Sequence, residues 1–462
     1  MNTSNNRRHS RSFRRRGTRR HSTGRYDTSL QPEERIDGVE VLRPAHGGTC
    51  FAIDPATSTP MFVAHTLPGE IVTARVVTRR AKVIIADAVE VARASNERQP
   101  HIWPEAGPGG VGGADLGHVR PAAQRRWKHD VLVDQIRRVG GRALADHIGD
   151  TVGHDALMPR VASADDHSTT SDDSEEQLHW RTRADFTVSA TGRLAMARQR
   201  SHELVDIDDM PLLDRSLLDL DVLGNSRWRR LWKPGQRVRL VAPNASGRRV
   251  LIGASAFNAH MRRVDDRATW EVRCGGKVEH FSVAASGFWQ AHRCASSDLV
   301  TSVMEMCGLE RGDSVIELYS GAGLFTRFLA NRVGHPGAVV SVEGAEQAVA
   351  DARINLAHRP NVIAAHAAVT PSTIMQAWSD LEDRPDLVVL DPPRSGAGAD
   401  VIGAIVRTGA TRVILVSCDA AAGVRDMSAL VAAGYRVEDV RVLDLFPHTH
   451  HVETVCLMTR VR

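Results

Sequence analysis

The sequence lacks the features of membrane-spanning, secreted and disulfide-bonded proteins. No apolar run approaches the roughly 18 residues that a membrane-spanning helix needs. The N-terminus is basic but has no apolar core, so it does not resemble a secretory signal. The six cysteines include no C-x-x-C pair, which argues against a disulfide framework and against a local zinc motif. We therefore expect a cytoplasmic protein that makes no contact with a membrane.

Acidic residues are missing from the first 25 positions, which hold nine arginines. Such a segment has too little apolar surface to form a core, so we predict a disordered basic tail over residues 1–34 that attracts RNA phosphates. Residues 163–177 are acidic, rich in serine and threonine and without apolar periodicity, which predicts a disordered insert. The whole chain of 462 residues, 42% apolar and 25% charged, is long enough for about three domains.

Two β-rich regions are predicted before residue 296. Residues 35–96 contain short alternating strands separated by turns such as Pro68-Gly69. This pattern suits a small OB-like barrel of about five strands, a shape often used to bind oligonucleotides. Residues 97–295 form a β-rich central domain. It includes an amphipathic helix over residues 122–141, whose basic side chains are expected on a solvated face.

Strands and helices alternate over residues 296–462. Buried apolar strands that alternate with helices predict an α/β domain with a doubly wound, mostly parallel, Rossmann-like sheet. In such sheets the ligand lies at the carboxyl ends of the strands. Residues that directly follow strands in this region are therefore the candidates for a functional site.

A glycine-rich turn and an acidic residue predict a nucleotide site in this domain. Gly321 and Gly323 stand between a strand and a helix, and Glu343 ends the next strand 22 residues after Gly321. Glycine lets the backbone approach a nucleotide closely, and an acidic side chain at that place accepts hydrogen bonds from ribose hydroxyls. The third glycine of a pyrophosphate-binding loop is missing. Its absence disfavours NAD and favours S-adenosylmethionine, a cofactor without phosphates.

The segment Asp391-Pro392-Pro393-Arg394 closes another strand. Its prolines stiffen the loop and remove two backbone donors, which holds Asp391 at the ligand edge. Arg394 stands where N-methylating enzymes usually carry an aromatic residue that stacks on the target base. This departure argues against an amine as the methyl acceptor.

A cysteine and a glutamate at strand ends supply the groups that methylation of uracil carbon-5 requires. Cys418 ends a strand just before a possible helix N-terminus, which suits a thiolate. Carbon-5 becomes nucleophilic only after a thiolate has added to carbon-6, and a base must later remove the carbon-5 proton. Glu453, immediately before the last strand, can be that base.

The loop before Glu453 also carries three histidines. In an extended segment His448 and His450 point one way and His451 the other, so three metal ligands from this loop would converge poorly. No metal site is predicted. These histidines are expected to contact phosphate, to orient Glu453 or to pack within the loop.

Taken together, these motifs resemble the bacterial RNA uracil-C5 methyltransferases, with "DPPRSGAG" and "FPHTHHVET" as the specific elements. The resemblance implies that Cys418 is the nucleophile and Glu453 the general base. It also implies an RNA substrate, either rRNA or tRNA, and a TRAM-like RNA-binding domain over residues 35–96. The S-adenosylmethionine-site positions that it implies are Gln290, Tyr319, Glu343 and Asp391.

Three positions depart from the family pattern. Many relatives hold an iron–sulfur cluster through cysteines just after the barrel, but residues 100–118 contain no cysteine, so no cluster is predicted. Ala420 replaces the proline that commonly follows the Ser-Cys-Asp motif, which softens the turn. The third strand offers only His366 where relatives carry an acidic or amide residue near the adenine, and no role is assigned to it.

Two other functions stay open. RNA cytosine-C5 methyltransferases also use a cysteine nucleophile, but they carry a second cysteine after the proline of the Asp391-type loop, where this chain has Arg394. A catalytically silent RNA-binding factor on the same scaffold would have no need for both Cys418 and Glu453. The favoured prediction is therefore uracil methylation by a monomer.

Overall fold

The fold is given by a computed structural model that describes residues 34–162, 177–381 and 383–461. The predicted basic tail and the predicted acidic insert lie outside these residues, apart from Glu34 and Gln177 at their ends. The residues from Arg35 onward form one compact unit. Among the helices of the described ranges, none is both long and apolar enough to cross a membrane.

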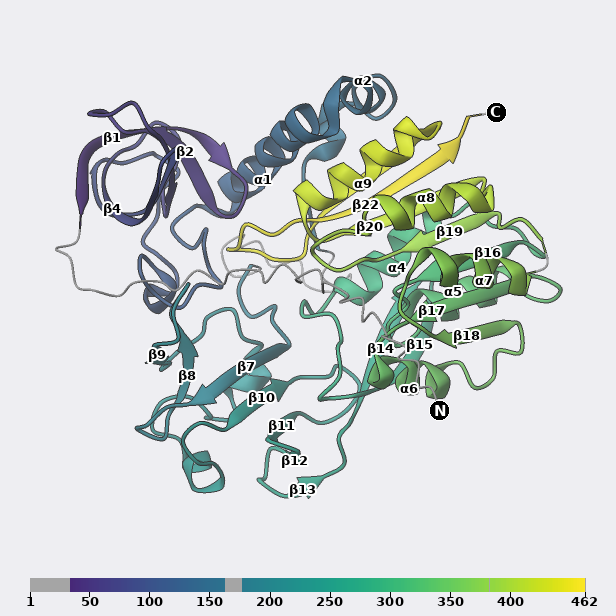
Figure 1. Ribbon diagram of the computed structural model, residues 1–462. Coiled ribbons are helices and arrows are strands. Elements are labelled where there is room, and N and C mark those ends of the chain that lie inside the picture. Colours follow the sequence, from purple (N-terminus) through teal and green to yellow (C-terminus); the bar gives the residue numbers. More distant parts are fainter. Residues whose placement is uncertain (1–33, 163–176, 382, 462) are drawn as a thin grey trace, which may run out of the picture. The chain divides into compact units, whose positions relative to one another are not determined.

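A closed five-stranded barrel opens the described chain, with the strand order β1-β2-β3-β5-β4 (Figure 1). Alternate residues such as Val39, Val41 and Val72 are buried inside it. The turn before β4 uses Gly69 at φ +83°, a conformation that glycine adopts without steric cost. The predicted small barrel is thus confirmed. Its strands are β1 (Arg35–Ala45), β2 (Thr49–Ile53), β3 (Pro60–Ala64), β4 (Ile71–Arg80) and β5 (Val83–Arg93).

The central region contains a seven-stranded antiparallel sheet with the order β13-β12-β11-β10-β7-β8-β9. The buried side chains of Trp103, Trp180 and Trp228 belong to its core. The β14–β15 hairpin is separate, and its apolar residues pack into the core of the C-terminal domain. The elements are β7 (Arg183–Val188), β8 (Leu194–Ala197), β9 (Leu204–Asp206), α3 (Arg215–Leu218), β10 (Arg237–Val241), β11 (Arg249–Ile252), β12 (Ser255–Phe257), β13 (Arg263–Val264), β14 (Arg267–Cys274) and β15 (Lys277–Ala284).

The C-terminal domain is built on an eight-stranded sheet with the order β18-β17-β16-β19-β20-β22-β21-β6. Strands β16 to β20 are parallel, and β22 runs antiparallel to both of its neighbours. The predicted Rossmann-like α/β fold is confirmed. Its strands are β6 (Arg160–Val161), β16 (Ser314–Leu318), β17 (Ala338–Glu343), β18 (Val362–His366), β19 (Leu387–Leu390), β20 (Arg412–Ser417), β21 (Tyr435–Asp444) and β22 (Glu453–Arg460).

Helices cover both faces of this sheet (Figure 1). Helices α7, α8 and α9 lie on one face, with α1 and α2 packed on α9, while α4, α5, α6 and the β14–β15 hairpin lie on the other. The helix predicted over residues 122–141 is divided, because a π-helical turn (Ile136–Gly140) separates α1 from α2. The bounds are α1 (Pro121–Gln135), α2 (Gly141–Thr151), α4 (Ala295–Met306), α5 (Leu324–Val333), α6 (Glu346–Asn355), α7 (Pro371–Leu381), α8 (Ala399–Thr408) and α9 (Ala420–Ala432).

The strand order places several loops at one edge of the sheet. It reverses between β16 and β19, and ligands bind at such a switch point, beyond the carboxyl ends of the strands. Because β22 is antiparallel to β20, the start of β22 lies at this same edge, with Ser417 paired to Thr454. The next residues outward, Cys418 and Glu453, therefore come side by side.

Candidate active site at the carboxyl edge of the sheet

The turn between β16 and α5 borders open space. Tyr319 adopts φ +62° and Gly321 φ +56°, and the amide of Tyr319 donates to the carbonyl of Val342 at 2.9 Å. A Cβ on Gly321 would meet nothing within 4 Å. Helix α5 begins directly after Gly323, which is left-handed. The backbone of this turn is therefore accessible to a ligand at the helix N-terminus.

Glu343 ties this turn to the end of β17. Its carboxylate accepts hydrogen bonds from the amides of Gly321 at 2.8 Å and Ala345 at 2.7 Å. A carboxylate has about four acceptor sites, so these two bonds leave capacity for the hydroxyls of a ribose.

Asp391 follows β19 at the switch point. Burial raises its pKa to about 7, because loss of water disfavours the negative charge. The loop behind it is anchored to α9, where the carboxylate of Asp426 accepts from the amides of Ala397 at 2.6 Å and Gly398 at 3.1 Å. A cationic ligand beside Asp391 would restore its charged form.

Cys418 directly follows β20 and directly precedes Asp419, the cap of α9. The side chain of Asp419 caps the helix by accepting from the amide of Ala422 at 2.9 Å. The predicted helix N-terminus is present, and the cap forms with Ala420 in place of proline. The barrel residue His46 also contacts this cap, with 3.3 Å between its Nε2 and the Oδ2 of Asp419.

The thiol of Cys418 and the carboxyl of Glu453 share one water-poor environment. Burial, together with the charges of Glu453 and Asp391, raises the pKa of Cys418 to about 12, while Arg394 opposes the shift. Burial and the charge of Asp391 likewise raise the pKa of Glu453 well above its ordinary value, again against the effect of Arg394. The side chain of Glu453 is 4% exposed. The thiol of Cys418 is therefore protonated near neutral pH in the ligand-free protein, and burial also disfavours the charged form of Glu453.

A single cavity of about 830 Å³ brings these residues together. Its lining also includes an aromatic side chain that is 72% exposed, Phe288, and two cations, Arg181 and Arg394. All six residues predicted from the sequence line it: Gln290, Tyr319, Glu343, Asp391, Cys418 and Glu453.

The lining fits S-adenosylmethionine. Glu343 has acceptor capacity for the ribose, and the apolar side chains of Leu324 and Phe325 offer a surface for the adenine. Asp391, whose pKa is raised by burial, would be stabilised as a carboxylate by the positive charge of the cofactor. The open space at Gly321 leaves room for the ligand against the backbone.

A buried ion pair holds the loop that leads to Glu453. The Nζ of Lys128, on α1, lies 2.6 Å from the Oδ1 of Asp444 and donates to the carbonyl of Phe446 at 3.0 Å. Both side chains of the pair are at most 1% exposed. The prediction that the basic side chains of this helix lie on a solvated face is wrong for Lys128, because a lysine can be buried when an anion and a carbonyl accept its protons.

Each histidine of this loop has its own surroundings. Gln124 contacts His448 twice, through its Nε2 at 2.9 Å from Nδ1 and through its Oε1, which accepts from the His448 amide at 2.7 Å. The Nδ1 of His450 lies 2.7 Å from the Oδ2 of Asp115. The ring of His451 packs on that of His450, with centroids 4.1 Å apart. The loop is thus oriented by residues 115–128.

Sequence reasoning missed these supporting residues. Asp115, Gln124 and Lys128 lie more than 300 positions from their partners, and their segment contains no motif that points to the C-terminal loop. Only the tertiary structure brings the two together.

Comparisons with known proteins agree with this geometry. The family model described as tRNA (Uracil-5-)-methyltransferase matches residues 251–461. An uncharacterized RNA methyltransferase of Streptomyces coelicolor is 37% identical, over 91% of this chain and 92% of its own. The chain belongs to a family of RNA methyltransferases. Membership confirms the predicted enzyme class, an S-adenosylmethionine-dependent RNA methyltransferase.

Two further similarities extend over nearly the whole chain. The 23S rRNA (uracil(1939)-C(5))-methyltransferase RlmD of Vibrio cholerae is 27% identical, over 96% of this chain and 98% of its own. The Pyrococcus abyssi tRNA (uracil-54, C5)-methyltransferase, solved with S-adenosyl-L-homocysteine, has a TM-score of 0.58 at 19% identity, over 91% of this chain and 99% of its own. The second similarity supports the shared fold.

Replacement of Lys128 is expected to destabilise the methyltransferase. Lys128→Met leaves the buried carboxylate of Asp444 without its cation, which costs about 3–5 kcal/mol of the free energy of unfolding. The double variant Lys128→Met/Asp444→Leu replaces the pair by apolar side chains and should recover most of this loss. Urea unfolding measures both, with Lys82→Met in the exposed β4–β5 turn as the control. A double variant no more stable than Lys128→Met would contradict the ion-pair assignment.

Ionisation of Asp391 is expected to lower stability as pH rises. Its folded pKa of about 7 exceeds the ordinary value of about 3.9, so the folded protein binds this proton more tightly than the unfolded chain. Its contribution to the free energy of unfolding therefore falls between about pH 4 and pH 7. Asp391→Asn removes that contribution, and the Tm of the variant relative to wild type should rise over this range. Exposed Asp400→Asn is the control, and a difference for Asp391→Asn that does not change with pH would contradict the assignment.

Proposed function

We propose that this enzyme forms 5-methyluridine in rRNA or tRNA through a covalent intermediate on Cys418. The observation that carries the proposal is the adjacency of Cys418 and Glu453 on paired strands at one cavity. Methylation of uracil carbon-5 needs one nucleophile and one base, and these two residues supply them.

S-adenosylmethionine supplies an electrophilic methyl group when it is bound. We assign Glu343 to its ribose and Asp391, Tyr319 and Gln290 to the rest of its site, since all four line the cavity. These side chains orient the methyl group toward the part of the cavity where Cys418 and Glu453 lie.

Cys418 acts as the nucleophile in this proposal. Loss of its proton is unfavourable in the ligand-free protein, since the pKa of the thiol is about 12. The guanidinium of Arg394 favours the thiolate, and the positive charge of a bound cation would offset the negative charge of the Asp391 carboxylate, which opposes formation of the thiolate. The thiol loses its proton to solvent, the thiolate sulfur forms a bond to carbon-6 of the uracil, and the electron pair displaced from the carbon-5 to carbon-6 double bond makes carbon-5 nucleophilic.

Glu453 acts as the base that ends the reaction. Once carbon-5 carries its new methyl group, the carboxylate removes the carbon-5 proton. The electron pair of that C–H bond restores the carbon-5 to carbon-6 double bond, the carbon–sulfur bond breaks and the Cys418 thiolate leaves. The raised pKa of Glu453 makes its carboxylate a stronger base than an exposed glutamate.

The RNA must present a single uridine out of the stack, because stacking covers carbon-6. Phe288, which is 72% exposed at the cavity, offers a surface for a base, and Arg181 and Arg394 offer positive charge to phosphate. We assign the five-stranded barrel, as a TRAM-like module, to the binding of the RNA backbone.

Nucleoside mass spectrometry of RNA fractions from a deletion strain identifies the target RNA by the loss of its 5-methyluridine. A loss of 5-methylcytidine instead would favour the cytosine alternative.

RNA that contains 5-fluorouridine is expected to trap the enzyme. Fluorine on carbon-5 leaves no proton to remove, so the bond from Cys418 to carbon-6 persists and a shifted band appears on a denaturing gel. Cys418→Ala should form no such band, whereas Cys274→Ser, at a partly exposed cysteine outside the cavity, should form it as wild type does. Undiminished adduct with Cys418→Ala would refute the nucleophile.

Glu453→Gln is expected to accumulate an adduct on ordinary uridine. The variant still forms the bond to carbon-6 and methylates carbon-5, but it cannot remove the proton. Turnover should fall by about 10²–10⁴-fold, while mass spectrometry detects methylated RNA attached to Cys418. The exposed variant Glu310→Gln serves as the control. Normal turnover without adduct in Glu453→Gln would assign the base to another residue.

A further inference from the structure

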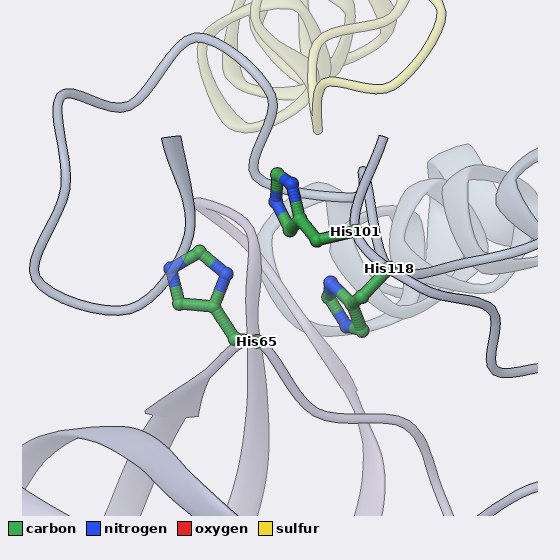
Figure 2. A group of neighbouring side chains, drawn as sticks. All are labelled: His65, His101 and His118. Carbon is green, nitrogen blue, oxygen red and sulfur yellow. The ribbon is translucent and has the colours of Figure 1, made fainter. Parts of the chain in front are cut away.

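Three histidines from distant parts of the sequence meet beside the barrel (Figure 2). His65 follows β3, His101 lies in the loop after the barrel, and His118 precedes α1. One nitrogen of each ring lies within 4.8 Å of the corresponding nitrogens of the other two. The ring centroids are 5.8 to 6.3 Å apart, and Figure 2 shows the rings arranged around a common space.

The hydrogen bonding of His118 suits a metal ligand. Its Nε2 lies 3.4 Å from the carbonyl of Thr66, which fixes this nitrogen as the donor. Its Nδ1 then carries the lone pair, and this buried atom has no hydrogen-bond partner among the described residues. Metal-bound histidines typically donate their other N–H to a carbonyl or carboxylate in this way. Burial lowers the pKa of His118 well below its ordinary value, so the ring is in the neutral, ligating form.

His101 differs from His118, because both of its ring nitrogens have hydrogen-bond partners. Its Nε2 lies 3.1 Å from the carbonyl of Ala114, and its Nδ1 accepts a hydrogen bond from the amide of Trp103 at 3.1 Å. A metal ion bound to His101 would replace the second of these bonds. A Cβ on residue 117 would lie 2.6 Å from this ring, so Gly117 leaves the space that His101 occupies. Burial, with the charge of His65, lowers the pKa of His101 to about 4.

His65 is held in an unusual backbone conformation. Its φ of +60° is uncommon for a residue other than glycine, and such strain concentrates at functional sites. Its side chain is 6% exposed, and its Nδ1 is a second buried nitrogen for which the described residues offer no hydrogen-bond partner. Two buried, unpartnered nitrogens that face one another are costly unless a further group binds them.

We propose that His65, His101 and His118 bind one divalent transition-metal ion such as Zn²⁺. Three neutral imidazoles and one open position form a familiar tetrahedral zinc set, with Zn–N distances of about 2.0–2.1 Å. That geometry places the nitrogens roughly 3.4 Å apart, so small side-chain rotations close the site from its present spacing.

The charges that act on His65 include two carboxylates as well as the cations Arg98 and Arg200. The carboxylates of Asp87 and Asp115 both act on His65, and the Oδ1 of Asp87 is buried without a hydrogen-bond partner in the described part of the chain. The nearby cation Arg98 is already neutralised, because its Nε and a terminal nitrogen lie 2.6 and 2.7 Å from the carboxylate of Glu70.

The ion would link the barrel to residues 101–118, the segment that contacts the loop before Glu453. His65 belongs to the barrel, while His101 and His118 flank the segment in which Asp115 contacts His450 and the amide of Leu116 donates to the carbonyl of His448 at 2.9 Å. The three histidines are absent from the described lining of the cavity. The metal site is therefore structural and separate from methyl transfer.

Metal binding to the full-length protein tests the proposal without reference to activity. The protein, purified without a histidine tag and stripped with a chelator, is titrated with Co²⁺ and followed by visible absorption, with Zn²⁺ as competitor. We expect one ion per chain and a rise in Tm on addition of Zn²⁺, since a ligand that binds the folded state stabilises it. His65→Gln and His118→Gln should bind at least tenfold more weakly and lose the Tm rise. The exposed variant His358→Gln should behave as wild type.

Two results would overturn the site. If the wild-type protein binds neither Co²⁺ nor Zn²⁺ stoichiometrically, the three histidines only pack against one another and form no metal site. Unchanged binding by both glutamine variants places the ion elsewhere. Circular dichroism verifies that each variant is folded, and His101→Asn replaces any variant that is not, so that loss of binding always reports on a folded chain.

Discussion

The buried ion pair between Lys128 and Asp444 is the constraint on which the active site depends. A lysine deep in a protein requires an anion at close range, and Asp444 meets that requirement at the end of β21. The same ammonium group binds the carbonyl of Phe446, so one side chain fixes both the strand end and the start of the following loop. Glu453 ends this loop, and its position is therefore coupled to α1.

The electrostatics of the cavity follow from the burial of its titratable groups. Cys418, Asp391 and Glu453 each prefer to be neutral there, and each negative charge makes the next one harder to form. Negative charge in the cavity is thus disfavoured in the ligand-free protein. A cationic cofactor beside Asp391 would offset the charge of that carboxylate. The pKa of the Cys418 thiol would therefore depend on whether the cofactor site is occupied.

Much of the fold and of the candidate site could be predicted because its residues follow apolar strands. Cys418, Asp391 and Glu343 each end a strand whose hydrophobic run is visible in the sequence, and parallel strands bring such ends to one edge. The contacts between residues that are distant in sequence could not be predicted. Lys128 looks like any basic residue on an amphipathic helix, and the three histidines are separated by up to 53 positions and belong to two structural regions. The prediction of no metal site considered only histidines that are neighbours in sequence.

The pairing of β20 with β22 has a consequence for how this enzyme can diverge. The two residues proposed to react are held on neighbouring strands, since Cys418 directly follows Ser417 and Glu453 directly precedes its paired residue Thr454. The pairing of the two strands therefore sets the distance between these side chains. The sequences of the surrounding loops can change without altering it. Related enzymes that recognise different RNAs can thus differ in the residues that contact the substrate and still keep the same spacing between these two side chains.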